Sequence, residues 1–242
     1  MTQRGPNDHS TSKPLYADDS YMREFRANVI KAGPRFVVLD RTAFYPESGG
    51  QPSDTGTLTV DGVEYQVLKV MKRGRDIFHY LDGNIPSASS VHGVINWEPR
   101  FYNMRRHSAE HLLTGLFERA GSGPKVYSDL TSLEFKPSDL TSEAVNQVEA
   151  EFNGIVNEGL LVRTYYMSRE ELEDEDDERK RGFLDKIPRT IENLRMVEIP
   201  GHALTFCFGT HVGGTREIGH LDSMTLQESR KGSRRVTFTL VD

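Results

Sequence analysis

The sequence predicts an α+β protein in which a small N-terminal β-barrel precedes a second domain of mixed helices and strands. Short alternating runs occupy about residues 21–97, two helical patterns follow, and further strand-like runs complete the chain. We therefore expect three parts: a mobile polar tail at 1–20, a barrel domain with a glycine loop at 21–98, and an α+β domain at 99–242.

The barrel is predicted from short runs in which apolar and polar residues alternate between turn residues. Asp61 and Gly62 lie between two such runs and give the strongest hairpin signal in the chain. Five or six strands without an intervening helix favour closure, because closure removes exposed strand edges. The expected strands are 35–40, 56–60, 63–70, 76–81 and 91–97.

The pattern changes to a helical period near Trp97. Pro99 suits a first helical turn, and the apolar spacing after it predicts a helix that ends near Gly121. Thr141 and Gly159 mark the ends of a second predicted helix. Further strands are expected at 132–136, 161–167, 194–199, 204–208 and 234–241.

Composition excludes several classes of protein. Of 242 residues, 36% are hydrophobic and 27% charged, and no stretch approaches the ~18 consecutive apolar residues of a membrane span. The N-terminal segment has no apolar core and contains acidic residues, unlike a secretory signal or a mitochondrial presequence. Cys207 is the only cysteine, so no intrachain disulfide can form. We expect a cytosolic protein.

The net charge of −6 is concentrated in one segment. Residues 169–178 hold eight acidic residues and one arginine, a local charge of −7, so the rest of the chain carries +1. This segment is typical of a solvated loop or helix end. The acidic balance therefore does not exclude an RNA partner, but any basic surface must be local.

Two pairs of residues have the spacing of metal ligands. His107 and His111 are four residues apart on one helix face, and Cys207 and His211 repeat that spacing. Three imidazoles and a thiolate suit tetrahedral Zn²⁺. Each pair alone is more often incidental, and a lone cysteine is usually a small buried hydrophobe. A metalloprotease of the HExxH type is not favoured, because Ser108 stands where that motif requires glutamate.

Three segments carry a family resemblance: 44–56 (FYPESGGQPSDTG), 105–113 (RRHSAEHLL) and 207–212 (CFGTHV). They resemble the editing domains of alanyl-tRNA synthetases, and their order and spacing resemble freestanding alanyl-tRNA editing proteins of the AlaX type. Segments 161–164, 167–171, 195–199 and 214–219 also fit. The resemblance covers about residues 25–240 and leaves no room for an aminoacylation domain, which implies editing in trans.

This resemblance implies a small β-barrel followed by a zinc-containing editing domain of the alanyl- and threonyl-tRNA synthetase type. It implies hydrolysis of the aminoacyl ester on mischarged tRNA(Ala), chiefly Ser-tRNA(Ala), with Gly-tRNA(Ala) as a second candidate. The zinc ligands that it implies are His107, His111, Cys207 and His211. The chain departs from the family at Glu110, often threonine, and at Phe208, more commonly glycine, so the amino-acid preference stays open.

The chemistry is reasonable on its own. A synthetase pocket sized for alanine cannot strongly reject serine or glycine, so a second hydrolytic site is needed to correct errors. Zn²⁺ can lower the pKa of a bound water or position the substrate. Because four protein ligands leave no open position, we favour a zinc that holds the aminoacyl end while a positioned water attacks. Glu110 is the candidate base or water-orienting residue; the alternative is a glutamate on the helix surface.

The glycine loop, residues 47–52 (ESGGQP), and several basic residues complete the candidate site. Adjacent glycines allow positive φ and a close approach to a ligand, although an ordinary hairpin loop is the alternative. The expected pocket residues are Ser48, Gly49, Gly50 and Gln51. Arginine and lysine side chains would bind tRNA phosphates in a salt-dependent way. The candidates for tRNA binding are Arg105, Arg106, Lys231, Arg234 and Arg235, with Arg100 and Arg230 beside them.

Two other functions stay open from the sequence. One is a non-catalytic tRNA-binding module that zinc stabilises, and the other is a deacylase of free D-amino acids or small esters that needs no tRNA. The complete ligand set and the glycine loop favour the editing hydrolase.

Overall fold

The computed structural model describes residues 11–126, 130–136, 140–174, 184, 190–228 and 232–241. The chain divides into two compact units, residues 1–48 with 52–100 and residues 49–51 with 101–242. Three residues of the glycine loop therefore belong to the second unit, together with the two ligand pairs.

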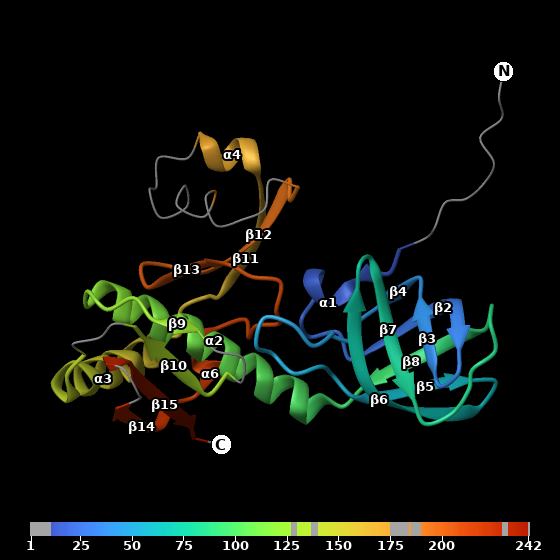
Figure 1. Ribbon diagram of the computed structural model, residues 1–242, viewed down its shortest axis with the longest axis horizontal. Coiled ribbons are helices and arrows are strands. Elements are labelled where there is room, and N and C mark those ends of the chain that lie inside the picture. Colours follow the sequence, from blue (N-terminus) through green and yellow to red (C-terminus); the bar gives the residue numbers. More distant parts are fainter. Residues whose placement is uncertain are drawn as a thin grey trace. The chain divides into compact units, whose positions relative to one another are not determined.

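The first unit contains a closed six-stranded barrel, as the sequence predicts (Figure 1). Its strands follow the order β2-β3-β7-β6-β5-β8, and every neighbouring pair is antiparallel. The strands are β2 (Glu24–Gly33), β3 (Phe36–Leu39), β5 (Gly56–Val60), β6 (Val63–Arg73), β7 (Asp76–Leu81) and β8 (Ser90–Ile95). Alternate side chains of β5, β7 and β8 are buried, which is the period-two pattern of strands whose inner side chains fill a small barrel.

The predicted hairpin between β5 and β6 is confirmed. Val60 pairs with Val63, and Asp61 and Gly62 between them have φ values of 49° and 82°. Two consecutive positive φ values are those of the two-residue turn that matches the twist of the flanking strands.

The prediction of a mobile tail over 1–20 is wrong for residues 13–18. Strand β1 (Lys13–Pro14) pairs with β4 (Arg41–Thr42), and α1 (Leu15–Asp18) follows directly. Tyr16 is 5% exposed, and its ring packs edge-on against Tyr45 with centroids 5.2 Å apart. Burial of this aromatic ring keeps the segment packed against the barrel unit, although its composition is mostly polar. Residues 1–10 lie outside the described residues.

Two long helices form where the sequence predicts them. Helix α2 spans Trp97–Arg119, and α3 spans Ser142–Glu158. The Thr141 side chain caps α3 by accepting a hydrogen bond from the Ala144 N–H, and Gly159 ends it in the left-handed conformation with φ 73°.

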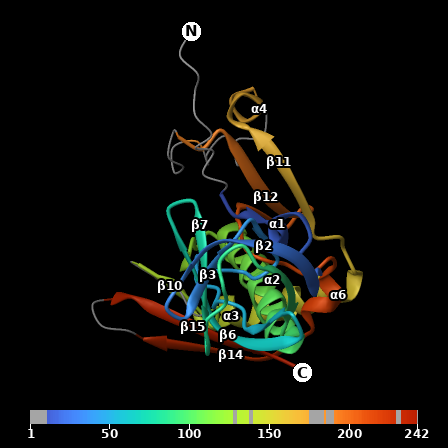
Figure 2. The same ribbon diagram turned by 90° about the vertical axis from the view of Figure 1, so that its right-hand side faces the viewer.

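Two antiparallel sheets lie in the second unit. One has the order β14-β15-β10-β9, made of β14 (Leu221–Glu228), β15 (Arg234–Leu240), β10 (Ser132–Phe135) and β9 (Lys125–Val126). The other is β11-β12-β13, made of β11 (Arg163–Ser168), β12 (Asn193–Ile199) and β13 (Ala203–Phe206). Figure 2 shows β11 and β12 side by side, with α4 (Arg169–Glu173) following β11. A four-residue helix, α6 (Thr215–Ile218), precedes β14.

The first part of the acidic segment forms the capped helix α4. Ser168 accepts a hydrogen bond from the Glu171 N–H, and the Glu171 carboxylate accepts one from the Ser168 N–H. Leu172 is fully buried against Leu194 and Met196, so this turn is anchored to the three-stranded sheet. The rest of the acidic run, 175–178, lies outside the described residues.

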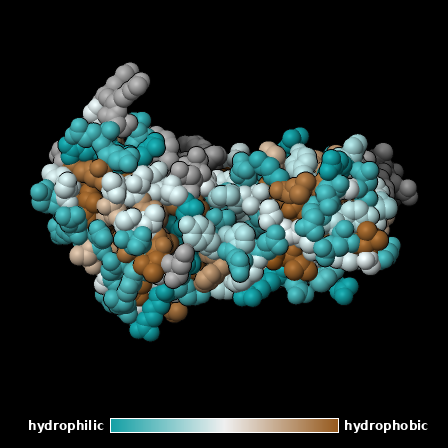
Figure 3. Space-filling model, turned by 90° about the horizontal axis from the view of Figure 1, so that it is seen from below, coloured by the Kyte–Doolittle hydropathy of each residue, from teal (hydrophilic) through white to brown (hydrophobic). Residues whose placement is uncertain are grey.

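No described helix combines the length and the apolar character that a bilayer crossing requires. On the face shown in Figure 3, hydrophobic residues form separate spots among polar ones. Large exposed hydrophobic side chains in the second unit include Tyr102, Leu161, Tyr166 and Phe208. Scattered exposed apolar residues of this kind are normal for a folded surface.

Candidate metal centre

Helix α2 supplies the first pair of candidate ligands. His107 and His111 lie one turn apart on the same face, with their ring centroids 4.8 Å from each other. Apolar residues on the inner face of the helix, among them Met104, Leu112 and Leu116, are fully or almost fully buried. This packing fixes the helix and therefore the direction in which the two imidazoles point.

The loop that follows β13 supplies the second pair, Cys207 and His211. A buried cation holds the start of this loop: Arg195 on β12 is 1% exposed and donates through Nη1 to the carbonyl oxygens of Cys207 and Gly209, at 2.8 and 2.9 Å. The Cys207 N–H in turn donates to the Arg195 carbonyl oxygen at 3.0 Å. The loop is thus fastened to the sheet at two of its residues.

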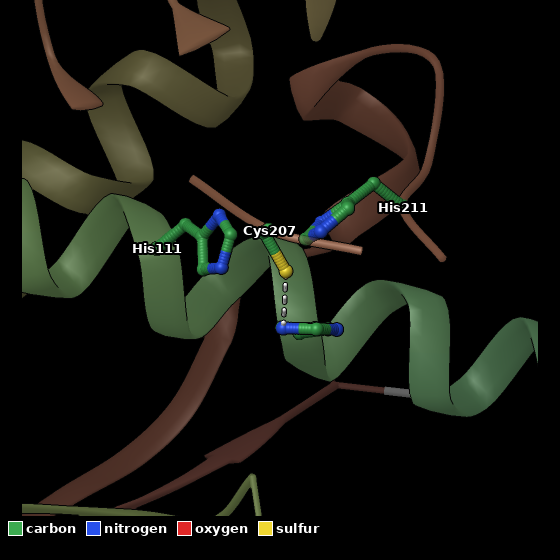
Figure 4. Close-up of side chains that lie close together, drawn as sticks. His111, Cys207 and His211 are labelled. Atoms are coloured by element: carbon green, nitrogen blue, oxygen red, sulfur yellow. Dashed lines mark hydrogen bonds between the residues drawn. The ribbon is translucent and has the colours of Figure 1, made fainter. Parts of the chain in front are cut away.

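The structure brings all four predicted ligands together. Their ligand atoms lie within 4.8 Å of one another, although the two pairs are about a hundred residues apart in sequence (Figure 4). The Sγ of Cys207 is 3.4 Å from Nε2 of His107, the contact marked by the dashed line. A tetrahedral zinc ion would hold a sulfur and an imidazole nitrogen about 3.6 Å apart, so this separation suits a shared metal.

A glycine is required beside His107. A Cβ atom on Gly209 would lie 2.1 Å from Cε1 and 2.5 Å from Nδ1 of the His107 ring. The CFGTH segment can therefore approach the helix only because this position has no side chain.

Burial controls the charge of the four groups. It lowers the pKa of His111 to about 3 and lowers the pKa of His107 and of His211 well below 6.5, and the positive charge of Arg195 lowers all three further. Burial also raises the pKa of the Cys207 thiol to about 11, despite the opposing effects of the Gly209 N–H and Arg195. The imidazoles are thus neutral, as metal ligands must be, whereas the buried thiolate needs a cation beside it.

In two of the histidines, Nδ1 lies within hydrogen-bond distance of a polar side chain, which leaves Nε2 as the candidate ligand atom. Ser108 Oγ lies 3.2 Å from Nδ1 of His211 and accepts a hydrogen bond from the Val212 N–H. Gln51 Oε1 lies 3.0 Å from Nδ1 of His107. Outer partners of this kind are usual for metal-binding histidines, since they fix the tautomer and the ring orientation.

The donor set fits a metal ion. Three imidazoles and one thiolate are the soft and borderline ligands that zinc prefers. Among the described residues, the buried Nδ1 of His111 has no hydrogen-bond partner, which leaves that nitrogen available for a cation.

The glycine loop lies in part beside this cluster. Gly49 and Gly50 have φ values of 55° and 87°, the positive φ that the sequence predicts for this pair. Gln51 is fully buried in the same unit as the cluster. Ser48 belongs to the first unit and is exposed, and its carbonyl and hydroxyl oxygens hydrogen bond with the hydroxyl of Tyr45.

Glu110 differs from the surface residue considered as its alternative. Its side chain is 2% exposed on α2, and its negative charge contributes to the raised pKa of the Cys207 thiol. Glu110 therefore lies near the ligand cluster, three residues after His107 on the same helical face.

The candidate tRNA-binding arginines have different environments. Arg105 donates from Nε to the Ile218 carbonyl oxygen at 3.0 Å and also to that of Val241. Arg106 donates to the Leu130 carbonyl oxygen and lies over the ring of Tyr102. Arg235 is exposed, whereas Arg234 is partly buried and pairs with Glu228 at 3.7 Å. Lys231 and Arg230 lie outside the described residues.

Arg100 is not available to RNA, contrary to the sequence-based expectation. It is 1% exposed and forms a buried ion pair with Asp54, and its guanidinium also donates to the carbonyl oxygens of Ser20 and Ala43. A charged residue that follows Pro99 in the first turn of a helix usually faces solvent. Here Asp54 compensates the charge, so burial is possible.

Comparison with known proteins gives matches over almost the entire chain. The family described as tRNA synthetases class II (A) matches residues 8–99, and the threonyl and alanyl tRNA synthetase second additional domain matches residues 194–237. The alanyl-tRNA editing protein AlaX-M of Methanosarcina barkeri is 38% identical, over 96% of this chain and 100% of the relative. The chain belongs to the alanyl-tRNA editing protein family.

Two further relatives support this family. The AlaX-M protein of Methanosarcina acetivorans is also 38% identical, over 94% of this chain and 98% of its own length. The alanine–tRNA ligase of Ignicoccus hospitalis is 34% identical over 94% of this chain, but the match covers only 26% of that ligase. This editing-family chain thus corresponds to about a quarter of the ligase.

Sequence reasoning gave no role to three residues beside the cluster of this editing-family protein. These residues, each at most 1% exposed, are Arg195, Ser108 and Thr210. Arg195 donates to the Cys207 carbonyl oxygen, Ser108 hydrogen bonds with His211, and Thr210 accepts a hydrogen bond from Gln51. The only signal was their position: Ser108 and Thr210 lie within the two ligand segments, and Arg195 lies between the apolar residues Leu194 and Met196 of a predicted strand.

Phe208, the departure from the commoner glycine, is 43% exposed. Its ring packs edge-on against Phe206, with centroids 5.1 Å apart.

Proposed function

We propose that this chain is a trans-editing hydrolase that cleaves the aminoacyl ester of mischarged tRNA(Ala), chiefly Ser-tRNA(Ala) and secondarily Gly-tRNA(Ala). The observation that carries the proposal is the cluster of His107, His111, Cys207 and His211, two of them buried and two partly buried, in a chain that is 38% identical to an alanyl-tRNA editing protein along its length. Because aminoacyl-tRNA is consumed in translation, we place the protein in the cytoplasm.

The four clustered residues would hold Zn²⁺. When bound, zinc supplies Lewis-acid chemistry that polarises or positions the ester. The neutral imidazoles suit this assignment, and a cation bound beside Cys207 would favour its thiolate over the thiol. Arg195 keeps the Cys207 loop in place through its two carbonyl contacts.

Glu110 is the residue that we assign to the attacking water. The water oxygen forms a bond to the ester carbonyl carbon, the bond to the ribose oxygen breaks, and that oxygen takes up a proton as free amino acid leaves. A carboxylate in the buried position of Glu110 would orient the water and accept its proton. Gly49, Gly50 and Gln51 would contribute the wall of the amino-acid pocket, since backbone without Cβ atoms allows close approach.

The tRNA would be held through its phosphates. Arg235 is exposed and is the most accessible of the described candidates, and Arg106 lies on the ligand helix directly before His107. Arg105, Arg234 and Lys231 complete the proposed set. Contacts of this kind position the acceptor end and weaken as salt is raised.

The test is hydrolysis of preformed Ser-tRNA(Ala), Gly-tRNA(Ala) and Ala-tRNA(Ala), with a tRNA-free seryl ester as a fourth substrate. We expect rapid loss of the serine ester, slower loss of the glycine ester, and a spared alanine ester. Turnover of the free ester at the same rate would instead show a small-ester deacylase. Tight tRNA binding without turnover would show the non-catalytic tRNA-binding module.

A further inference from the structure

Gln51 connects the two halves of the ligand cluster. Its side chain is 0% exposed and bonds to residues from both ligand segments. Oε1 lies 3.0 Å from Nδ1 of His107 and 3.1 Å from the backbone nitrogen of Thr210, while Nε2 donates to Thr210 Oγ1 at 2.8 Å. One amide therefore joins helix α2 to the loop that carries Cys207 and His211.

The contacts of Gln51 determine which way its amide faces. The backbone N–H of Thr210 can only donate, so the Gln51 atom that faces it must be the carbonyl oxygen. The same oxygen faces Nδ1 of His107, and an oxygen that has no proton can only accept there. Nδ1 of His107 must therefore carry the proton.

This tautomer leaves Nε2 of His107 as the nitrogen with a lone pair. Nε2 is the atom that lies 3.4 Å from the Cys207 sulfur, on the side where the ligand atoms converge. A histidine that binds a metal through Nε2 needs this arrangement, with the other ring nitrogen donating to an oxygen.

We propose that Gln51 is a positioning residue of the metal centre, which fixes the tautomer and ring orientation of His107 and ties that ligand to the Cys207–His211 loop. The inference rests on the metal centre of the proposed function. It differs from a pocket-lining role, because it predicts an effect on metal binding when no substrate is present.

The first experiment measures the zinc dissociation constant by competition with a chelating dye. The variants are Gln51→Met, which removes the amide, and Gln51→Glu, whose carboxylate can still accept hydrogen bonds from both Thr210 and His107. Gln66→Met is the matched control, since Gln66 is an exposed glutamine of the barrel unit. Circular dichroism and the fluorescence of Trp97, the only tryptophan, check that each variant is folded.

We expect Gln51→Met to bind zinc about 10–100-fold more weakly than wild type, the usual cost of losing an outer-shell partner. Gln51→Glu and Gln66→Met should stay close to the wild-type value. Equal zinc affinity in wild type and Gln51→Met would overturn this inference alone. If wild type bound no zinc, the metal centre of the proposed function would fail, and this inference with it.

A second readout follows the proton on His107 directly. Long-range proton–nitrogen NMR of the zinc-loaded protein should show the His107 Nδ1–H in wild type, protected from exchange with solvent. In Gln51→Met that proton should exchange markedly faster. An unchanged exchange rate would contradict the hydrogen bond on which the inference depends.

Discussion

Gly209 lies directly against the imidazole ring of His107, so that a Cβ atom at this glycine would be 2.1 Å from the ring carbon Cε1. Real Cβ contacts are essentially never this short, and the neighbour is a candidate ligand whose Nδ1 lies 3.0 Å from Gln51 Oε1. The glycine of the CFGTH segment is therefore part of the geometry of the site.

Gly209→Ala should weaken zinc binding at least tenfold, because either the ring of His107 or the ligand loop must move. Overpacking of this kind also costs about 1–3 kcal/mol of stability. The control is Gly154→Ala in α3, where a Cβ meets no atom within 4 Å. That change should leave zinc binding intact and stabilise the helix by roughly 0.5–1 kcal/mol. Dye competition and thermal unfolding measure both effects, and wild-type zinc affinity in Gly209→Ala would contradict the packing argument.

Glu110→Gln should lower the rate of Ser-tRNA(Ala) hydrolysis about 10²–10⁴-fold, the usual contribution of a positioned base. The amide is close in size to the carboxylate but cannot accept the proton. Glu118→Gln, an exposed change on the same helix, is the control and should have wild-type activity. Zinc content should be unchanged in both variants. A Glu110→Gln protein that hydrolyses at the wild-type rate would remove Glu110 from the proposed mechanism.

Asp54→Ala should destabilise the barrel by about 3–5 kcal/mol, since it leaves the buried guanidinium of Arg100 without a counter-charge. Trp97 lies in the same unit and reports its unfolding by fluorescence in urea. The comparison is Lys69→Ala, which breaks an exposed ion pair with Glu47 and should cost under about 1 kcal/mol. Similar losses in the two variants would show that the buried pair has no special structural importance.

His79 should make the barrel sensitive to acid. Burial lowers its pKa from 6.5 to about 4, and its Nε2 lies 2.8 Å from Thr42 Oγ1. Between these two values the unfolded chain binds a proton that the folded protein does not, so stability is full above about pH 6.5 and falls as the pH drops towards 4. The total loss from this one group is about 3 kcal/mol.

The check is the pH dependence of urea unfolding in His79→Gln, followed by Trp97 fluorescence. Glutamine keeps a hydrogen-bonding side chain but does not titrate, so the stability of this variant should fall less between pH 7 and pH 4 than that of wild type. His92→Gln, a partly exposed change in the same barrel, should follow the wild-type curve. Parallel curves for wild type and His79→Gln would contradict the assignment.

Local patterns predicted most of the fold because they act over a few residues. The hairpin at Asp61 and Gly62 and the ends of α3 at Thr141 and Gly159 need only turn and capping chemistry. Strand β14 was not predicted, because most of its side chains are exposed and its sequence shows no clear apolar alternation. The structured segment at 13–18 was missed because tertiary burial of Tyr16 decides it.

The candidate ligands could also be predicted from the sequence, because they form two pairs that have the same four-residue spacing. The contacts that hold them in place were not, although Gln51 was expected as a pocket residue. Gln51, Ser108 and Arg195 contact His107, His211 and the Cys207 loop across separations of 56, 103 and 12 residues. Such contacts depend on how α2, the sheet and the loops pack, which no local pattern specifies.

The measurement that tests the account most directly is the rate of Ser-tRNA(Ala) hydrolysis as zinc is removed from the protein and then returned, with metal content determined at each step. We predict about one zinc per chain, as a four-ligand site requires, with activity that is lost and regained in proportion to the zinc content. Cys207→Ala should lack both the metal and the activity, whereas His220→Ala, an exposed histidine outside the cluster, should keep both. Full hydrolysis by the zinc-free wild-type chain, or a normal zinc content in Cys207→Ala, would contradict it.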